Sequence, residues 1–150
     1  MSYTERFTEN VCLLYNLAPI SVASGAEVFT SYVSLQNYHR AVIIIHTGVM
    51  AGTSTIDAVV HQAVDTAGSG TPKHLDTSKA ITQLTQAGGD SNKDVAIEVQ
   101  TEELDVDGGF DCIALGYTVG AAASIMSIEI YGLEPRFKPV PTTAWDEIVA

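Results

Sequence analysis

The strongest hydrophobic pattern in the chain lies between Tyr38 and Gly68. Two apolar, β-branched runs, Ala41 to His46 and Ile56 to Val64, have the composition of buried strands. The residues between them include those typical of turns, namely Gly48, Gly52, Thr53 and Ser54. The stretch therefore predicts a β-hairpin in the core of a sheet.

Shorter apolar runs predict further strands before and after this stretch. Val11 to Pro19 forms a strand candidate that ends at its proline, Ile20 to Ala26 resembles a turn, and Glu27 to Leu35 is a second candidate. In Val95 to Gln100, apolar and polar positions alternate cleanly, so Val95, Ile97 and Val99 are expected to face inward. Two strands therefore precede the central stretch and one half-exposed strand follows it.

The second half of the chain continues in the same way. Phe110 to Gly120 and Ser124 to Tyr131 predict a second hairpin across the small residues 121–123. Lys79 to Gln86 fits either a short helix or an edge strand, of which we favour the strand. Two turn-rich segments, Ser69 to Ser78 and Ala87 to Asp94, predict surface loops.

The number and spacing of these runs predict the fold class. About seven or eight strands, roughly 8–12 residues apart, are typical of an all-β domain. We therefore expect a single-domain antiparallel β-sandwich or jelly roll. A chain of 150 residues is long enough to bury a core without help from metals or disulfides.

The end of the chain has a different composition. Leu133 to Pro141 holds three of the five prolines, which favours an extended arm. Thr142 to Ala150 is compatible with one helical turn, with Thr143 as the N-cap and Asp146 and Glu147 in the first turn. We therefore divide the chain into a sandwich domain, residues 1–133, and an arm, residues 134–150.

Charge narrows the range of partners. Seven Lys and Arg residues against 18 Asp and Glu residues give a net charge of −11, which repels phosphate backbones and anionic lipids. We therefore expect neither nucleic acid nor a membrane as a partner. Only 17% of residues are charged and 46% are hydrophobic, as expected for strands covered on both faces or for a subunit of an assembly.

Cys12 and Cys112 each lie in an apolar run, so two buried free thiols are expected, with a disulfide between them as the alternative. The first ten residues are polar and lack the pattern of a signal peptide. The longest uncharged stretch, Cys112 to Ile128, is shorter than the roughly 20 residues of a membrane helix. A protein made and folded in the cytoplasm is the expectation.

No residue pattern predicts catalysis. His39, His46, His61 and His74 lie outside metal-binding spacings, and the common nucleophile and nucleotide-binding motifs do not occur. His61 would share a strand face with Asp57 and Asp65, which fits an acid–base or metal site, but we favour a solvent-facing polar stripe. We predict no catalytic residues, no metal site and no cofactor.

The acidic stretch from Glu102 to Asp111 has two interpretations. Asp105, Asp107 and Asp111 surround two glycines and could bind Ca²⁺ through their oxygens, although the spacing is not that of an EF-hand. The interpretation we favour is a solvated turn in which the glycines permit positive φ and the aspartates accept backbone hydrogen bonds.

Four segments resemble small structural proteins that tailed bacteriophages encode beside their major capsid protein. The resemblance spans about Ser34 to Val140, and its motifs are LQNYHRA at 35–41, QAVDTAG at 62–68, ELDVDGGF at 103–110 and PRFKP at 135–139. It implies a head decoration, or cement, protein: a β-sandwich or jelly-roll subunit, commonly a homotrimer. Such a protein sits on the capsid exterior, binds the major capsid protein and ties neighbouring capsomers together. No catalytic residue is carried over.

On this interpretation the arm is the contact region. We expect an intersubunit or capsid contact to include Arg136, Phe137, Lys138 and Trp145, because a proline-fixed arm loses little entropy on docking. In the alternative, Trp145 covers an edge of its own sandwich. A neck, tail or host-glycan-binding virion component is the alternative function, and a trimeric nucleotide hydrolase would need a motif that we do not find.

Overall fold

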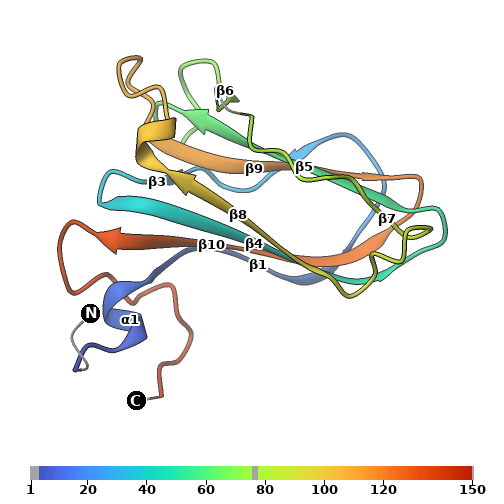
Figure 1. Ribbon diagram of the computed structural model, residues 1–150, viewed down its shortest axis with the longest axis horizontal. Helices are drawn as coiled ribbons and strands as arrows, with labels where there is room; N and C mark the ends of the chain where they lie inside the picture. Colours follow the sequence, from blue (N-terminus) through green and yellow to red (C-terminus); the bar gives the residue numbers. More distant parts are fainter. Residues whose placement is uncertain (1–3, 76–77, 150) are drawn as a thin grey trace.

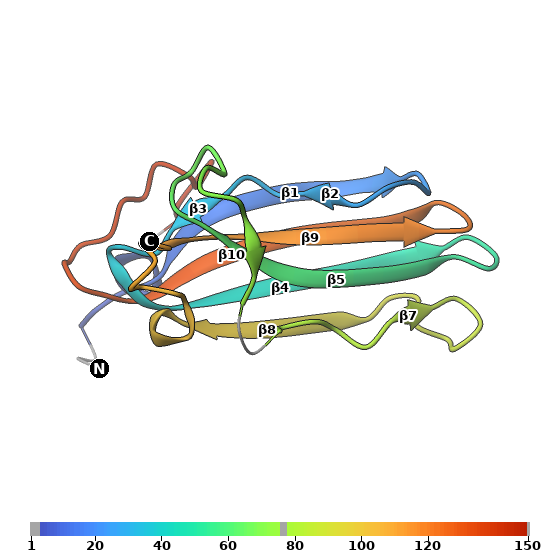
Figure 2. The same cartoon turned by 90° about the horizontal axis from the view of Figure 1, so that it is seen from above.

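Two antiparallel sheets face each other in the computed structural model of the chain, which describes residues 4–75 and 78–149 (Figures 1 and 2). The first sheet has the order β1-β10-β4-β8, formed by Cys12–Val22, Ser124–Pro135, Tyr38–Met50 and Asp94–Gln100. The second has the order β2-β9-β5-β6, formed by Val28–Phe29, Cys112–Gly120, Thr55–Ala63 and Lys73–His74.

Two further short strands continue the edges of the second sheet. Val33–Ser34 (β3) pairs with β9 beyond β2, and Leu84–Thr85 (β7) pairs with β5 beyond β6. The described strands thus occupy eight positions in two sheets, which is the architecture of a jelly roll. The predicted all-β sandwich is confirmed. The helices are short: α1 (Phe7–Asn10) and a 3₁₀ turn, η1 (Thr101–Glu103).

The core lies between the two sheets and is lined by alternate residues of the long strands. β4 and β10 supply Ile43, Ile45, Ile128 and Ile130, and β9 supplies Leu115, all with no exposed surface. Because side chains alternate across a strand, the residues between them face outward. The predicted inward row of β8 is confirmed, because Ile97 and Val99 are buried and belong to this core.

The central stretch is not the hairpin that its pattern predicts. β4 pairs with β10 and β8, whereas β5 pairs with β9 in the opposite sheet. Residues 51–54 therefore cross from one sheet to the other, a distance of roughly 10 Å between packed sheets. Local sequence does not distinguish such an arch from a hairpin, because both need two strands and a turn; the partners are chosen by distant strands.

The predicted second hairpin is wrong for the same reason. β9 lies in the second sheet and β10 in the first, so residues 121–123 form another crossing. The two crossings support each other: the Ala51 amide donates to the Ala123 carbonyl at 3.1 Å, and the hydroxyls of Ser54 and Ser124 share a buried hydrogen bond. One residue in each crossing, Thr53 and Ala121, has a positive φ.

Two strand boundaries also differ from the predictions. β1 continues through Pro19 to Val22, because β1 is an edge strand and a shift of register around Pro19 accommodates the missing amide. The predicted strand from Glu27 to Leu35 is divided into β2 and β3, which lie beside the same strand, β9. Between them, the Thr30 amide donates to the Leu115 carbonyl at 3.0 Å, and the Thr30 hydroxyl accepts a hydrogen bond from the Leu115 amide.

Three further predictions, for the segment 79–86, the loop 69–78 and the tail, are confirmed only in part or are wrong. Within Lys79 to Gln86 the favoured strand is confirmed only for β7 and a single bridge at Ala80. The segment from Ser69 to Ser78 is largely loop, although Asp76 and Thr77 lie outside the described residues. The predicted helical turn in the tail is wrong for residues 142–149, where the Trp145 amide bonds the Thr142 carbonyl at 3.2 Å but no helix forms.

Both cysteines are buried free thiols, as predicted. Burial and the neighbouring Asp111 carboxylate raise the pKa of Cys112 to about 12. None of the helices among the described residues has the length and apolar composition that crossing a membrane requires.

Candidate functional site

The loop of residues 136–141, which we call the arm loop, returns the chain from the end of β10 to the end of the sandwich. It is held at both ends. The Arg136 amide donates to the Asn37 carbonyl at 2.8 Å, and the Val140 side chain is 4% exposed in a small cluster with Cys12 and Tyr38. The Cys12 thiol also contacts the Pro141 carbonyl oxygen at 3.3 Å. The arm loop is therefore packed against its own domain.

Two of the predicted contact residues project from this anchored loop. The Phe137 side chain is 76% exposed. Lys138 Nζ lies 2.9 Å from Glu5 Oε2, which ties the loop to the N-terminal segment and holds the pKa of Glu5 below its usual value. Arg136, Phe137 and Lys138 thus lie together on one exposed loop.

The fourth predicted residue, Trp145, lies elsewhere. Its ring is 6.2 Å from the ring of Tyr131, centroid to centroid, on the outer face of the first sheet. The indole nitrogen is buried and has no hydrogen-bond partner among the described residues. Trp145 therefore lies against its own sandwich, as in the alternative stated above, but on the face of a sheet and not at its edge. Its role in a partner contact stays a prediction.

A groove of about 790 Å³ opens between the N-terminal segment and the start of the arm loop. Its apolar lining includes Phe7, Val11, Leu133 and Pro135, and Phe7 is 62% exposed. Its charges are already matched within the chain, because Arg40 pairs with Glu134 at 3.3 Å, as Lys138 does with Glu5. The groove thus offers apolar surface with locally balanced charge.

The sequence did not reveal this groove. Phe7, Arg40 and Leu133 come from three separate segments, which meet only because β4 and β10 are neighbours and α1 packs beside β10. One feature of the sequence could have pointed to the groove: β4 and β10 carry apolar residues on both faces. This pattern indicates that another segment covers the outer face of these strands. Figure 1 shows α1 and the tail beneath this sheet.

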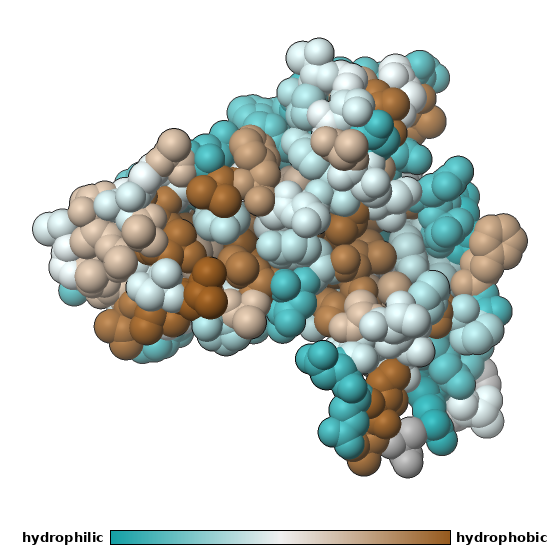
Figure 3. Space-filling model, turned by 180° about the vertical axis from the view of Figure 1, so that it is seen from behind, coloured by the Kyte–Doolittle hydropathy of each residue, from teal (hydrophilic) through white to brown (hydrophobic). Residues whose placement is uncertain are grey.

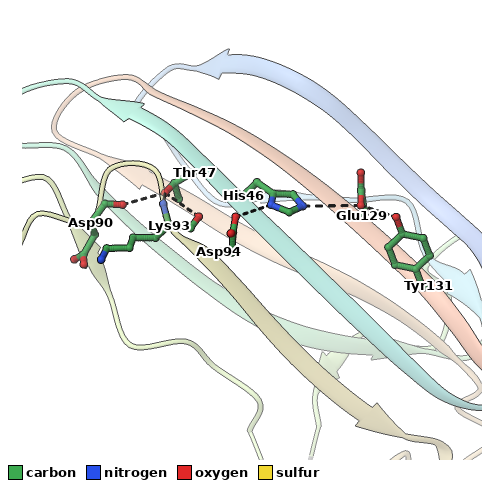
Figure 4. A network of polar contacts seen from close by, with 7 residues as sticks. All are labelled: His46, Thr47, Asp90, Lys93, Asp94, Glu129 and Tyr131. Carbon is green, nitrogen blue, oxygen red and sulfur yellow. Dashed lines mark hydrogen bonds and ion pairs between the residues drawn. The ribbon is translucent and has the colours of Figure 1, made fainter.

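A polar ladder crosses the outer face of the first sheet farther from the arm loop (Figure 4). His46 on β4 lies between two carboxylates: Nδ1 is 2.7 Å from Asp94 Oδ1 on β8, and Nε2 is 4.0 Å from Glu129 Oε2 on β10. Tyr131 donates to Glu129 at 2.6 Å. Burial and Glu129 raise the pKa of Tyr131 to about 12, so its hydroxyl stays protonated.

Thr47 on β4 also contacts the residues just before β8 (Figure 4). Its hydroxyl lies 3.0 Å from the Asp90 carbonyl oxygen and 3.2 Å from the Lys93 carbonyl oxygen. The Lys93 amide donates back to the same hydroxyl at 2.9 Å. These groups are engaged with one another across three strands. The arrangement holds the strands in register.

His61 is not part of a solvent-facing stripe, so that prediction is wrong. Its side chain is buried on the outer face of the second sheet, with ring centroids 4.8 Å from Phe29 and 4.4 Å from His74. Burial lowers the pKa of His61 and the neighbouring His74 lowers it further, whereas Glu27, 3.4 Å from Nε2, acts in the opposite direction.

The two aspartates predicted to join His61 have other partners. Asp57 accepts a hydrogen bond from Gln83 at 2.7 Å, and Asp65 accepts the amides of Ala67 and Ser69 at 2.9 Å. Across residues 4–75 and 78–149, no group of three or more His, Cys, Asp or Glu side chains is arranged to hold a metal ion.

The acidic turn also uses its carboxylates internally. Asp105 Oδ2 lies 2.7 Å from Lys73 Nζ, and Oδ1 accepts the Gly108 amide at 2.9 Å. Asp111 accepts a hydrogen bond from the Cys112 thiol at 3.0 Å, and Gly109 has a φ of 80°. The capping aspartate and the glycine with positive φ agree with the solvated-turn interpretation.

Replacing Lys73 with alanine is expected to raise the pKa of Asp105 toward its usual value of 3.8, because Lys73 is the largest cause of the lowered pKa. A carboxyl group whose pKa is lowered in the folded state stabilises the fold at pH values above its usual pKa. This stability is lost as the pH falls through the lowered pKa. The variant should therefore lose less stability on acidification. Carboxyl NMR titration measures the shift, with Lys93→Ala as control; an unchanged Asp105 pKa would contradict the ion pair.

Apolar side chains are also exposed on the side of the sandwich where β1 and β2 lie. Ile20 on β1 and Val28 on β2 are 45% and 48% exposed. Figure 3 views the molecule from behind, and hydrophobic residues reach the surface there in several brown patches. Exposed apolar surface of this kind is common where a protein contacts a partner.

Comparisons with known proteins identify no family for this chain. No protein family matches the chain, and no curated protein matches it significantly. A chain in the structure of infectious bursal disease virus Gt strain is similar over 83% of this chain and 42% of that chain, with 9% sequence identity and a TM-score of 0.28. The chain thus spans less than half of that protein, and a TM-score this low carries no argument.

Proposed function

We propose that the protein is a non-enzymatic structural component of a bacteriophage virion, which binds the outside of the capsid as a cement protein and stabilises capsomer contacts. The motif resemblance described above supports the proposal. Jelly rolls are frequent among viral capsid proteins, which is an analogy at the level of the fold. In this proposal the partner is the major capsid protein, and the homotrimer implied by the resemblance stays a prediction.

The observation that carries the proposal is the presentation of Phe137. An exposed aromatic on a mobile tail would lose conformational entropy on docking, whereas the arm loop is already fixed by Val140 and by the Arg136 amide. Burying a phenylalanine yields about 1.5–3 kcal/mol. A rigid loop that displays one is suited to contact a partner.

The surfaces beside Phe137 extend the proposed contact. The groove lined by Phe7 and Leu133 opens next to Lys138, so a partner that covers Phe137 also reaches apolar surface there. Because Arg40 and Lys138 are already paired with carboxylates, the partner needs no strong charge of its own. Such a contact is expected to depend weakly on salt concentration.

Replacing Phe137 with serine is expected to weaken binding to empty heads of the phage that encodes the chain. The loss of about 2 kcal/mol of apolar burial corresponds to roughly thirtyfold in the dissociation constant. Co-sedimentation of the purified chain with the heads measures it. Because Phe137 is exposed, its replacement should leave the unfolding midpoint unchanged.

Val106→Ser is the matched control, because Val106 is 65% exposed on the acidic turn, away from the arm loop. This variant should bind as the unmodified chain does. Equal binding of Phe137→Ser and Val106→Ser would remove the arm loop from the contact. If the unmodified chain does not bind heads, and immunogold labelling places it on the tail or neck, the cement function is wrong.

A further inference from the structure

The edges of the two sheets differ in how they are protected against pairing with another strand. β1 carries Pro19 and two shifts of register, and β2, β3, β6 and β7 have two residues each. Prolines, irregular pairing and short strands are the usual means of blocking an edge. β8 has none of them: its seven residues pair with β4 without a shift. β8 is therefore the regular, open edge of the sandwich.

The backbone of β8 offers unpaired groups in a regular row. The Thr47 amide donates to the Lys93 carbonyl at 2.8 Å. By the antiparallel pattern, the backbone N–H and C=O groups of odd-numbered residues in β8 therefore point toward β4, and those of even-numbered residues point away from the sheet. Among the described residues, no hydrogen bond from outside the sheet reaches the backbone of Asp94, Ala96 or Glu98. The next outward amide, that of Gln100, is taken by Glu103 at 2.8 Å, which ends the open row.

Apolar surface lies directly behind this row. An open groove of about 550 Å³ separates β8 from residues 79–84 of the second sheet. It is lined by Val95 and Ile97 on one side and by Ile81 and Leu84 on the other. Figure 2 shows β8 and this segment running along the same side of the sandwich, opposite β1 and β2. A strand added at β8 would gain both backbone hydrogen bonds and apolar contacts.

We propose that a second copy of the chain occupies this edge, with the two β8 strands pairing antiparallel about a two-fold axis at Ile97. In this register Ala96 and Glu98 can exchange both backbone hydrogen bonds across the axis, whereas Gln100, whose amide is held by Glu103, offers only its carbonyl to the Asp94 amide of the second copy. Asp94 faces Gln100 of the second copy, and Ala96 faces Glu98 of the second copy. The two four-stranded sheets then become one continuous sheet of eight strands.

The charges of β8 select this register over its neighbours. In any such pair, the outward backbone groups of even-numbered residues must face those of even-numbered residues in the second copy. The other registers that keep most of β8 paired therefore have their two-fold axis at Ala96 or at Glu98. An axis at Ala96 places Asp94 against Glu98 of the second copy, and an axis at Glu98 places two Glu98 side chains together. Like charges directly opposite destabilise a strand pair, and the axis at Ile97 opposes none.

A two-fold contact also explains how an unprotected edge can exist without open-ended association. In an isologous dimer each copy uses its edge to cover the other, so no open edge remains to extend a filament. The contact uses neither the arm loop nor Phe137. It is therefore independent of the proposed capsid contact, and the experiments on the two surfaces can fail separately.

Substitutions at Ala96 test both the contact and its register. Ala96 is exposed on the outer face of β8 in the single chain, so its replacement should leave the fold of each copy intact, and only the dimer should change. Ala96→Asp places a like charge against Glu98 twice per dimer, and Ala96→Lys places an opposite charge there. From typical cross-strand energies, the dimer dissociation constant should rise about two- to thirtyfold for aspartate and fall by a similar factor for lysine.

Sedimentation equilibrium of the full chain measures these changes, and a charge exchange supplies the control. Ala96→Asp combined with Glu98→Lys should restore dimerisation, because the paired charges are again opposite. A monomeric wild-type chain at all accessible concentrations would overturn the proposal, as would a trimer that no substitution at Ala96 affects. The same direction of change for aspartate and lysine would exclude the register. If Ala96→Asp instead weakens binding of a monomer to heads, the occupant is a strand of the capsid protein.

Discussion

Replacing Tyr38 with alanine is expected to lower the free energy of unfolding by about 3–5 kcal/mol, as for other buried aromatics. The side chain is 5% exposed and its ring lies directly on Gly132, where an added Cβ would be 2.7 Å from the nearest ring atom. Tyr38 also forms the small cluster with Cys12 and Val140 that anchors the arm loop. Its loss should therefore destabilise the fold and release the arm loop together.

Two measurements separate these effects. Urea unfolding gives the change in stability, and the reaction of Cys12 with a thiol reagent reports whether the arm loop still covers it. In the unmodified chain Cys12 is 5% exposed, so it should react only on unfolding; in Tyr38→Ala it should react in native buffer.

The control for Tyr38 is its exposed neighbour. His39→Ala should change stability by no more than about 0.5 kcal/mol, as is usual for surface substitutions. If Tyr38→Ala unfolds more easily but Cys12 stays protected under native conditions, the cluster stabilises the sandwich without holding the arm loop. The presentation of Phe137 would then need another explanation.

Replacing Gln62 with leucine is expected to cost roughly 2–4 kcal/mol, because it leaves two polar groups without their partner. Gln62 has no exposed surface and faces the core from β5. Its Nε2 donates to the His74 carbonyl at 3.2 Å, and its Oε1 accepts the Asp105 amide at 2.8 Å. One side chain therefore fixes both β6 and the acidic turn to the sheet.

Hydrogen exchange and urea unfolding together test this role. In Gln62→Leu the Asp105 amide should exchange faster, because it loses its acceptor. Gln83→Leu is the matched control, since Gln83 is exposed and its side chain bonds Asp57 at the surface; it should change stability by no more than about 0.5 kcal/mol. Equal losses in the two variants would show that the buried amide contributes nothing specific.

The candidate site was only partly predictable from the sequence. The concentration of prolines after Leu133 indicated a distinct segment, and the structure places Arg136, Phe137 and Lys138 together on its exposed loop. The same composition did not reveal that Val140 turns back to pack against Cys12 and Tyr38. Such packing depends on residues more than a hundred positions apart, which no local pattern contains.

His61 shows the same limit for a single side chain. Its spacing from Asp57 placed it correctly on the outer face of its strand, because side chains alternate. Its burial depends on Phe29 and His74, which reach it from two other strands. Alternation thus determined the face, and only the neighbours determined whether that face meets solvent.

The sequence by itself determined that Tyr38 to Gly68 holds two strands, that β8 has one buried face and that the fold is an all-β sandwich. These features follow from composition and alternation along a few adjacent residues. Only the tertiary structure decided that β4 and β5 belong to opposite sheets, and that β8 ends one of them as an open edge. Strand partners are selected by the packing of apolar faces across the whole chain, so the connections that look like hairpins became crossings between the sheets.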